Sequence, residues 1–294
     1  MFLLNTLQQT LIFLPLAFGV YLSYDILMVT DLTVEGTFVL GAAIFARLVT
    51  LGINQFLSVL IALLGGALIG IGVTVMQRAA KINSLIAGIL ATFMLYSVNF
   101  GVMNKPNISL LDNNIFLQHL QDYHANLLLG FLIALTLSLS LSLYFFLKSQ
   151  LGLSLRAFGC NPHLLKKLGK KPAIYLGLGL AVSNLLSAFC GVMTAQLDGY
   201  ADIHMGFGMA LTAIGAVVIG KKLIAGFCKD HFNPLIGMLG CFIGAFIYFA
   251  ILNGFLMMNI NPVYLKLFLG LVLVGFLSTA HYSKQRGELY ATAD

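Results

Sequence analysis

A few polar side chains lie in or beside long apolar segments, where polar groups are costly and therefore informative. They are Asp31, Thr33, Glu35, Asn83, Asn99, Asn184 and Gln196. Such side chains can bind a polar solute and pass it across an apolar layer, so we expect some of them to line a translocation path. The alternative is a structural role, because side-chain amides also cap helices and hydrogen-bond neighbouring helices.

Glu35 is the candidate that we favour for function. A carboxylate near a membrane boundary needs water or a cationic partner. Arg47 is the nearest basic residue in its segment, but it lies twelve positions further along and is expected near the other face.

The apolar segments carry no pattern that predicts catalysis or a metal site. They contain no Ser/His/Asp set, no Cys/His pair, no HExxH and no paired carboxylates. The run from Gly215 to Lys222 has the glycine spacing of a phosphate-binding loop, but Lys222 stands where Ser or Thr must reach magnesium. His119 and His124 suit a solvated loop. We therefore expect no enzyme activity, no cofactor and no metal. If the protein transports a solute with energy from ATP, the ATPase must be another chain.

The composition excludes a soluble protein. Of the 294 residues, 60% are hydrophobic and 9% are charged, against about 25% charged residues in an ordinary soluble domain. Disorder requires the opposite composition. The net charge is +6, and the basic residues lie in short loops between apolar segments. This distribution is typical of membrane proteins and argues against nucleic-acid binding.

Solid apolar blocks predict an all-α, polytopic helical bundle in a lipid bilayer and not a β-barrel. We expect about nine spans, with eight to ten allowed because the second and seventh are short and contain glycine. The predicted spans are Leu7–Met28, Leu32–Thr50, Phe56–Met76, Asn83–Met103, Asn126–Leu147, Ala173–Leu197, Met205–Gly220, Asn233–Met257 and Pro262–Tyr282.

The basic residues predict the orientation. Of the 16 Lys and Arg residues, all but Arg47, Lys105 and Lys266 follow an odd-numbered span. Because positive charge favours the cytoplasmic side, we expect the N-terminus outside and the C-terminus in the cytoplasm of a bacterium, with the chain in its inner membrane.

Two segments resemble each other and predict an inverted internal repeat. One begins at Asp31 and reaches Gly66xxxGly70; the other begins at Asp202 and reaches Gly240xxxGly244. They start five spans apart and so run in opposite senses, as in many transporters. We expect one transmembrane domain over residues 1–294. Repeat one covers about 7–103, a linking span about 126–147, a cytoplasmic loop 148–172 and repeat two about 173–282.

The loop 148–172 predicts a short docking helix. Asn161 can cap it, Pro162 fits the first helical position and Gly169 fits the left-handed stop. Leu164 and Leu168 lie on its apolar side together with Leu165. The helix could dock in a partner protein or lie on anionic lipid, and the residues alone favour neither.

The run from Gly152 through Arg156, Gly159 and Asn161-Pro162 to Leu168-Gly169 resembles the coupling loop of ABC-importer permeases of the branched-chain amino acid and ribose class. The segments beginning at Asp31, Ile82, Leu95, Lys105 and Ala195 resemble a less characterised, amino-acid-type branch of that class. Cys160 and Lys170-Lys171-Pro172 depart from its usual pattern.

The resemblance implies a two-fold symmetric permease dimer, a cytoplasmic ATPase and an external solute-binding protein. We favour a dimer of two identical chains. The coupling role would fall to Gly152, Arg156, Ala157, Gly159, Asn161, Pro162, Leu164, Leu168 and Gly169. We expect an importer of a small polar solute, and we favour an amino-acid-like solute. An ion-driven secondary transporter is the alternative, and it would also explain the repeat and Glu35.

Overall fold

The computed structural model describes residues 2–258 except 124 and 226–232, together with the single residues 264, 267, 270 and 271. The predicted ninth span Pro262–Tyr282 and the C-terminus therefore lie outside the continuous described part.

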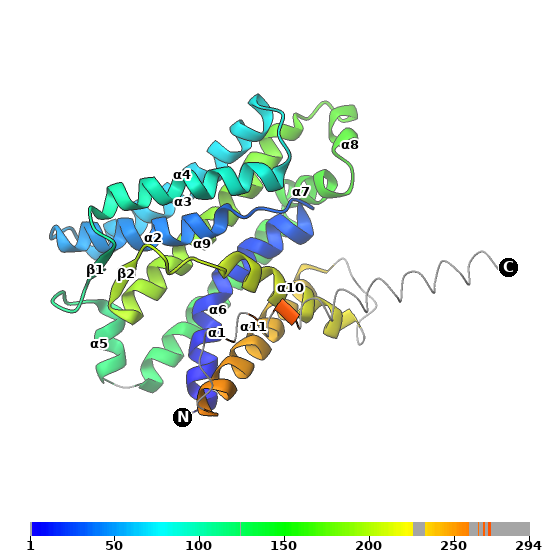
Figure 1. Ribbon diagram of the computed structural model, residues 1–294. Coiled ribbons are helices and arrows are strands. Elements are labelled where there is room, and N and C mark those ends of the chain that lie inside the picture. The colour runs from blue at the N-terminus through cyan, green and yellow to red at the C-terminus, as the bar shows by residue number, and fades with distance from the viewer. Residues whose placement is uncertain are drawn as a thin grey trace.

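The architecture is a helical bundle, which confirms the predicted fold class (Figure 1). A π-helical turn, η1, continues α1 without a break. The elements in chain order are α1 (Phe2–Val20), η1 (Tyr21–Ile26), α2 (Thr33–Thr50), α3 (Gln55–Ala79), α4 (Ser84–Met103), β1 (Asn107–Ser109), α5 (Phe116–Tyr123), α6 (Ala125–Lys148), α7 (Gln150–Cys160), α8 (Pro162–Lys167), α9 (Pro172–Asp198), β2 (Tyr200–Asp202), α10 (Met209–Ala225) and α11 (Pro234–Met257).

Seven helices within the described residues are long and apolar enough to cross a membrane. They correspond to the first six predicted spans and the eighth. The predicted seventh span, Met205–Gly220, starts too early, because residues 203–208 form a turn and α10 begins only at Met209. This turn contains Gly206 and Gly208, and α10 covers the 17 residues from Met209 to Ala225.

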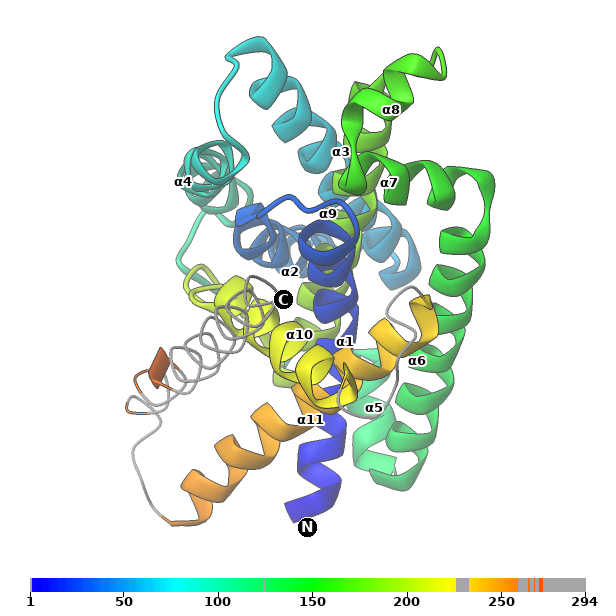
Figure 2. The ribbon, with the colours of Figure 1, turned by 90° about the vertical axis from the view of Figure 1, so that its right-hand side faces the viewer.

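Helices α2 and α9 form the centre of the bundle. Most residues of α2 and α9 are buried, whereas fewer than a third are buried in α3, α4, α6 and α11. Figure 2 shows α2 and α9 surrounded by these outer helices. Helix α9 packs against α1, α2 and α3, and α1 packs against α11. Exposed apolar side chains on outer helices suit contact with lipid or with another copy.

The two GxxxG pairs both allow close helix packing, but they pack against different helices. A Cβ on Gly70 would lie 2.2 Å from the Leu180 carbonyl oxygen of α9. A Cβ on Gly244 would lie 1.8 Å from the Ala216 carbonyl oxygen of α10. Only glycine permits such approaches. The inverted repeat stays a prediction.

Two three-residue strands join the connections that follow α4 and α9. Strands β1 and β2 pair antiparallel, with Asn107 opposite Asp202. The pairing places the ends of α4 and α9 on the same side of the molecule, far from α7 and α8 in Figure 1.

Candidate functional site

A buried polar cluster joins the start of α2 to the middle of α9. Asn184 donates from Nδ2 to a carboxylate oxygen of Asp31 at 2.8 Å and to the Leu180 carbonyl at 2.9 Å. Its Oδ1 accepts from Thr37 Oγ1 at 2.8 Å, with Thr33 Oγ1 at 3.0 Å. The other oxygen of Asp31 accepts from the backbone N–H and the hydroxyl of Thr33. All four polar side chains are buried.

This cluster satisfies its own polar atoms. Burial raises the pKa of the Asp31 carboxyl above its ordinary value, and hydrogen bonds from Thr33 and Asn184 act in the opposite direction. Because donors already occupy both carboxylate oxygens, the geometry favours a role in fixing α2 against α9 over direct contact with a solute.

A chamber of about 550 Å³ lies between α2, α4 and the segment that joins β2 to α10. Most of its lining is apolar, and polar groups come from Glu35, Thr92, Tyr96, Asn99 and His204. A mostly apolar cavity with a few convergent polar groups is the usual form of a small-molecule site.

Glu35 and Asn99 enter the chamber wall from two helices that touch each other. Asn99 Nδ2 donates to the Gly36 carbonyl at 3.1 Å, which places the Asn99 amide one residue from Glu35. Asn99 Oδ1 is buried and has no hydrogen-bond partner in the described part of the chain. Glu35 Oε1 accepts from the backbone N–H of Ala210 at 3.3 Å, in the first turn of α10. Glu35 thus links α2 to α10.

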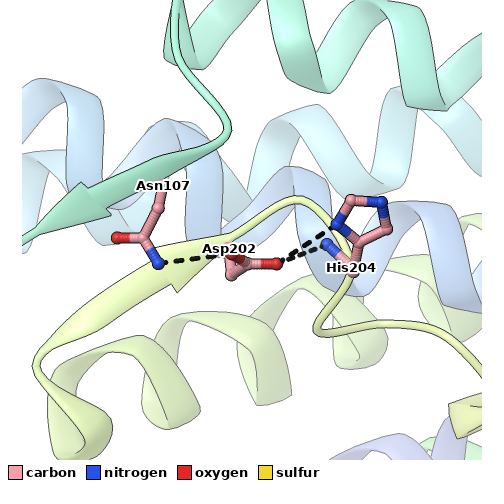
Figure 3. A network of polar contacts seen from close by, with 3 residues as sticks. All are labelled: Asn107, Asp202 and His204. Carbon is pink, nitrogen blue, oxygen red and sulfur yellow. Dashed lines mark hydrogen bonds and ion pairs between the residues drawn. The ribbon is translucent and has the colours of Figure 1, made fainter.

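The rim of the chamber carries a small polar network (Figure 3). Asp202 Oδ1 accepts from the backbone N–H of His204 at 2.8 Å and lies 3.6 Å from its ring Nδ1. Asp202 Oδ2 accepts from Asn107 Nδ2 at 3.3 Å. The His204 ring stands 6.1 Å from the Tyr96 ring. The network ties the β1–β2 pair to the chamber edge.

The predicted coupling loop contains two helices and not one. The short helix is where the sequence places it: Asn161 caps α8 through His163 N–H at 2.9 Å, Pro162 is its first residue and Gly169 has φ +70°. The run that includes Gly152, Arg156, Ala157 and Gly159, however, forms α7. Ser149 caps α7 at Gly152, a signal that was available in the sequence.

Helix α8 presents an apolar surface away from the bundle. Leu165 is buried, but Leu164 and Leu168 are 47% and 63% exposed. Leu164 lies in α8, and Leu168 is its C-cap residue four positions further on, so the two side chains lie on the same side of this short helix.

Helix α7 faces the end of α1. A Cβ on Gly159 would lie 2.0 Å from the Ile26 carbonyl oxygen of η1, so the two backbones are in direct contact. Two nitrogens of the Arg156 guanidinium are buried, and its charge acts on Tyr21 of η1. Arg156 thus faces the permease interior instead of the surface beside Leu168.

An ion pair connects η1 to α10. Lys221 Nζ donates to Asp25 Oδ1, and a second cavity of about 680 Å³ lies beside the pair. Sequence analysis did not identify Asp25 as a site residue, because 196 positions separate it from Lys221. It also missed Thr37, although Thr37 follows Thr33 by one helical turn.

Two predicted path residues lie elsewhere. Asn83 is exposed just before α4, where its Oδ1 accepts from Ser84. Gln196 is buried near the end of α9 and lines none of the cavities described above.

The sequence also matches known proteins. Residues 2–277 match the family model described as the permease component of branched-chain amino acid transport systems. The chain belongs to this permease family. It is therefore an ABC-type transport permease and not an enzyme, and its apolar helices make it a multi-pass inner-membrane protein.

Several relatives cover most of the chain. An uncharacterised protein of Rickettsia prowazekii (strain Madrid E) is 47% identical over 281 residues, which cover 94% of this chain and 97% of that protein. The tyrosine transport system permease protein of Clostridioides difficile (strain R20291) is 34% identical, with 95% and 91% covered. A nucleoside ABC transporter permease of Lactococcus lactis subsp. cremoris (strain MG1363) is 26% identical, with 77% and 74% covered. No solved structure matches the chain.

Proposed function

We propose that this permease imports a small polar solute, with an amino acid favoured, using ATP hydrolysed by a separate cytoplasmic subunit. An external solute-binding protein delivers the solute, and a second copy of the chain completes the path. The C-terminus lies in the cytoplasm. The tyrosine transport permease among the relatives supports an amino acid as the solute.

The observation that carries the ATPase partner is the surface of α8. Leu164 in α8 and Leu168 directly after it expose apolar area, and α8 follows α7 at the edge of the bundle (Figure 1). A pair of exposed leucines four residues apart suits insertion into an apolar groove. The flanking Lys166 and Lys167 keep the helix at an aqueous boundary.

The contacts behind α8 supply a route from the ATPase to the solute path. Helix α7 touches η1 at Gly159, η1 holds α10 through Asp25 and Lys221, and the other end of α10 meets Glu35. Displacement of α7 would therefore move α10 relative to α2. Because packed helices shift as units, a small movement at the docking surface can change access at the chamber.

The test is co-purification of the permease with the ATPase encoded nearest to it. We expect Leu164→Asp with Leu168→Asp to abolish the association, because two buried carboxylates would replace the apolar contact. Leu51→Asp is the matched control, since Leu51 is 60% exposed beyond the end of α2. Arg156 is unsuitable for this test because two nitrogens of its guanidinium are buried, so a substitution there could disturb folding.

Loss of association in the double variant alone would support the docking role. If the unchanged chain binds no ATPase, the ATP-driven proposal fails and an ion-driven carrier becomes the better account. If both variants still bind, the docking surface lies elsewhere.

A further inference from the structure

We propose that the cavity of about 680 Å³ beside Asp25 is the inner part of the solute path, and that the connection from Leu27 to Leu32 is the gate between this cavity and the chamber. The inference rests on the proposed import function and extends it. It assigns a route within one copy of the chain and names the segment that closes this route.

The connection is not helical, although it reaches the middle of the bundle. It joins η1 to α2 and is the blue trace between them in Figure 1. Asp31 is held by Asn184, near the midpoint of α9, and the Leu32 carbonyl accepts from Thr92, near the midpoint of α4. Non-helical backbone at membrane depth is tolerated only where protein buries it or where it lines a water-filled cavity. Transporters build solute paths from such interrupted spans.

Two cavities adjoin the connection at different points. Met28 and Thr30 line the cavity of about 680 Å³, whereas Leu32 lines the chamber of about 550 Å³. One residue of extended chain spans at most about 3.5 Å, so only about 7 Å of backbone separates Thr30 from Leu32. Asp31, which lies between them, is 3% exposed and is bound to α9. This short stretch is therefore where the chain passes from one cavity to the other.

Helix α10 borders the same two cavities. Gly206, shortly before α10, lines the chamber, and Val218 and Lys221, in the second half of α10, line the cavity beside Asp25. The helix rises by about 14 Å from Met209 to Val218. The chamber and the cavity thus lie at successive heights along one helix. The seam between the connection and α10 is the direct route from one to the other, and the Asp25–Lys221 ion pair joins its two sides at the inner end.

The connection contains a strained backbone position. Met28 has φ +55°, a left-handed conformation that residues other than glycine rarely adopt, and its side chain is 66% exposed. On either side of it, the backbone N–H groups of Leu27 and Val29 donate to the carbonyl oxygens of Leu22 and Ser23 at 3.0 and 2.9 Å. Strained backbone persists only where its surroundings hold it, so a movement of η1 would release Met28.

The docking side of the permease reaches the connection directly. A Cβ on Gly159 of α7 would lie 2.0 Å from the Ile26 carbonyl oxygen and 3.3 Å from the carbonyl carbon of Leu27. Helix α7 therefore touches the first residue of the connection. A displacement of α7 by the ATPase would move the gate as well as α10.

Thiol labelling from each side of the membrane tests the gate. Thr30→Cys and Leu32→Cys would be compared in a background with Ser at Cys160 and Cys228 and Ala at the buried Cys190 and Cys241. The probe is a charged, membrane-impermeant methanethiosulfonate, applied to intact cells for the outer side and to inverted vesicles for the inner side. We expect each cysteine to react at least tenfold faster from one side, and the two to react from opposite sides.

A second pair and a control accompany this comparison. Met28→Cys and Phe93→Cys repeat it with more exposed positions, because Met28 lines the cavity beside Asp25 and Phe93 lines the chamber. Leu64→Cys is the control: Leu64 is 55% exposed on the outer helix α3 and lines neither cavity, so it should react from neither side.

Disturbing the strained position should open the gate. Met28→Val places a β-branched side chain at a left-handed position, which such residues strongly disfavour, so the connection must leave its present conformation. We expect Leu32→Cys then to react at least fivefold faster from the side of the cavity beside Asp25. Lys81→Val is the matched control, because Lys81 also has a positive φ, +52°, but lies in the turn after α3 and lines neither cavity.

Reaction of both cysteines from the same side, or of either from neither side, would overturn the inference. So would a rate for Leu32→Cys that Met28→Val leaves unchanged. The labelling needs neither ATPase nor solute, so a permease that binds no ATPase can still show the gate. A permease that docks its ATPase but exposes both positions to one side would refute only this inference.

Discussion

Exchanging the partners of the Asp31–Asn184 contact tests whether this buried cluster holds α2 against α9. Asn184→Asp would place a carboxylate oxygen where the amide nitrogen now stands, 2.8 Å from Asp31. Two negative charges at that distance repel by about 6 kcal/mol at an effective dielectric constant of 20. The pair can avoid this repulsion by retaining one proton. Holding a proton on a carboxyl group of ordinary pKa costs about 4 kcal/mol at pH 7 and about 1.5 kcal/mol at pH 5.

We therefore expect Asn184→Asp to destabilise the protein by about 4 kcal/mol at pH 7 and by clearly less at pH 5. The sign follows from the proton: the folded pair binds one that the unfolded chain releases, so the loss grows as pH rises. Asp31→Asn with Asn184→Asp restores one amide and one carboxylate. This exchange should recover more than half of the loss, with a remainder because Leu180 loses its donor.

Thermal unfolding in detergent can measure these differences. A fluorogenic thiol reagent would report exposure of Cys190 and Cys241, which are buried, in a background with Ser at the exposed Cys160 and at Cys228. Asn253→Asp is the control, because Asn253 donates to the neutral side chains of Thr6 and Gln9. The stability of the exchange variant would be compared with the sum of the changes measured for Asp31→Asn alone and Asn184→Asp alone. An exchange variant no more stable than that sum would refute the proposed pairing. So would a loss of stability in Asn184→Asp that does not depend on pH.

Two further predictions concern the route from α7 to α10. Gly159→Val should leave ATP hydrolysis in place but reduce solute uptake, because the valine side chain cannot fit against the Ile26 carbonyl. ATPase activity and solute uptake would be compared in proteoliposomes. Gly130→Ala is the control, because a Cβ at Gly130 meets no neighbouring atom within 4 Å. Equal coupling in both variants would contradict the contact. Asp25→Lys should raise the rate at which solute leaks passively from proteoliposomes. Adding Lys221→Asp should lower that rate again, because the ion pair is re-formed with its charges exchanged. A leak that persists in the double variant would argue against a gate at this pair.

Local sequence rules predicted the elements of this protein well. A helix that crosses lipid must satisfy its backbone hydrogen bonds within itself, so apolar length alone identifies most spans. The α8 signals are equally local: a capping Asn161, Pro162 at the first position and Gly169 after the end. Where local signals conflict, prediction was less accurate. The glycine-containing segment before Met209 is apolar enough to be included in a span, yet it forms a turn.

Only the tertiary structure decided which predicted site residues belong together. The sequence marked Asp31 and Asn184 as costly polar residues, but packing across 153 positions turned them into partners within one satisfied cluster. Packing also buried two nitrogens of the Arg156 guanidinium, and within the described residues it left the Asn99 side-chain oxygen without a hydrogen-bond partner. The free energy of a buried polar group depends on which atoms surround it, and a linear pattern carries no record of neighbours brought together from distant helices.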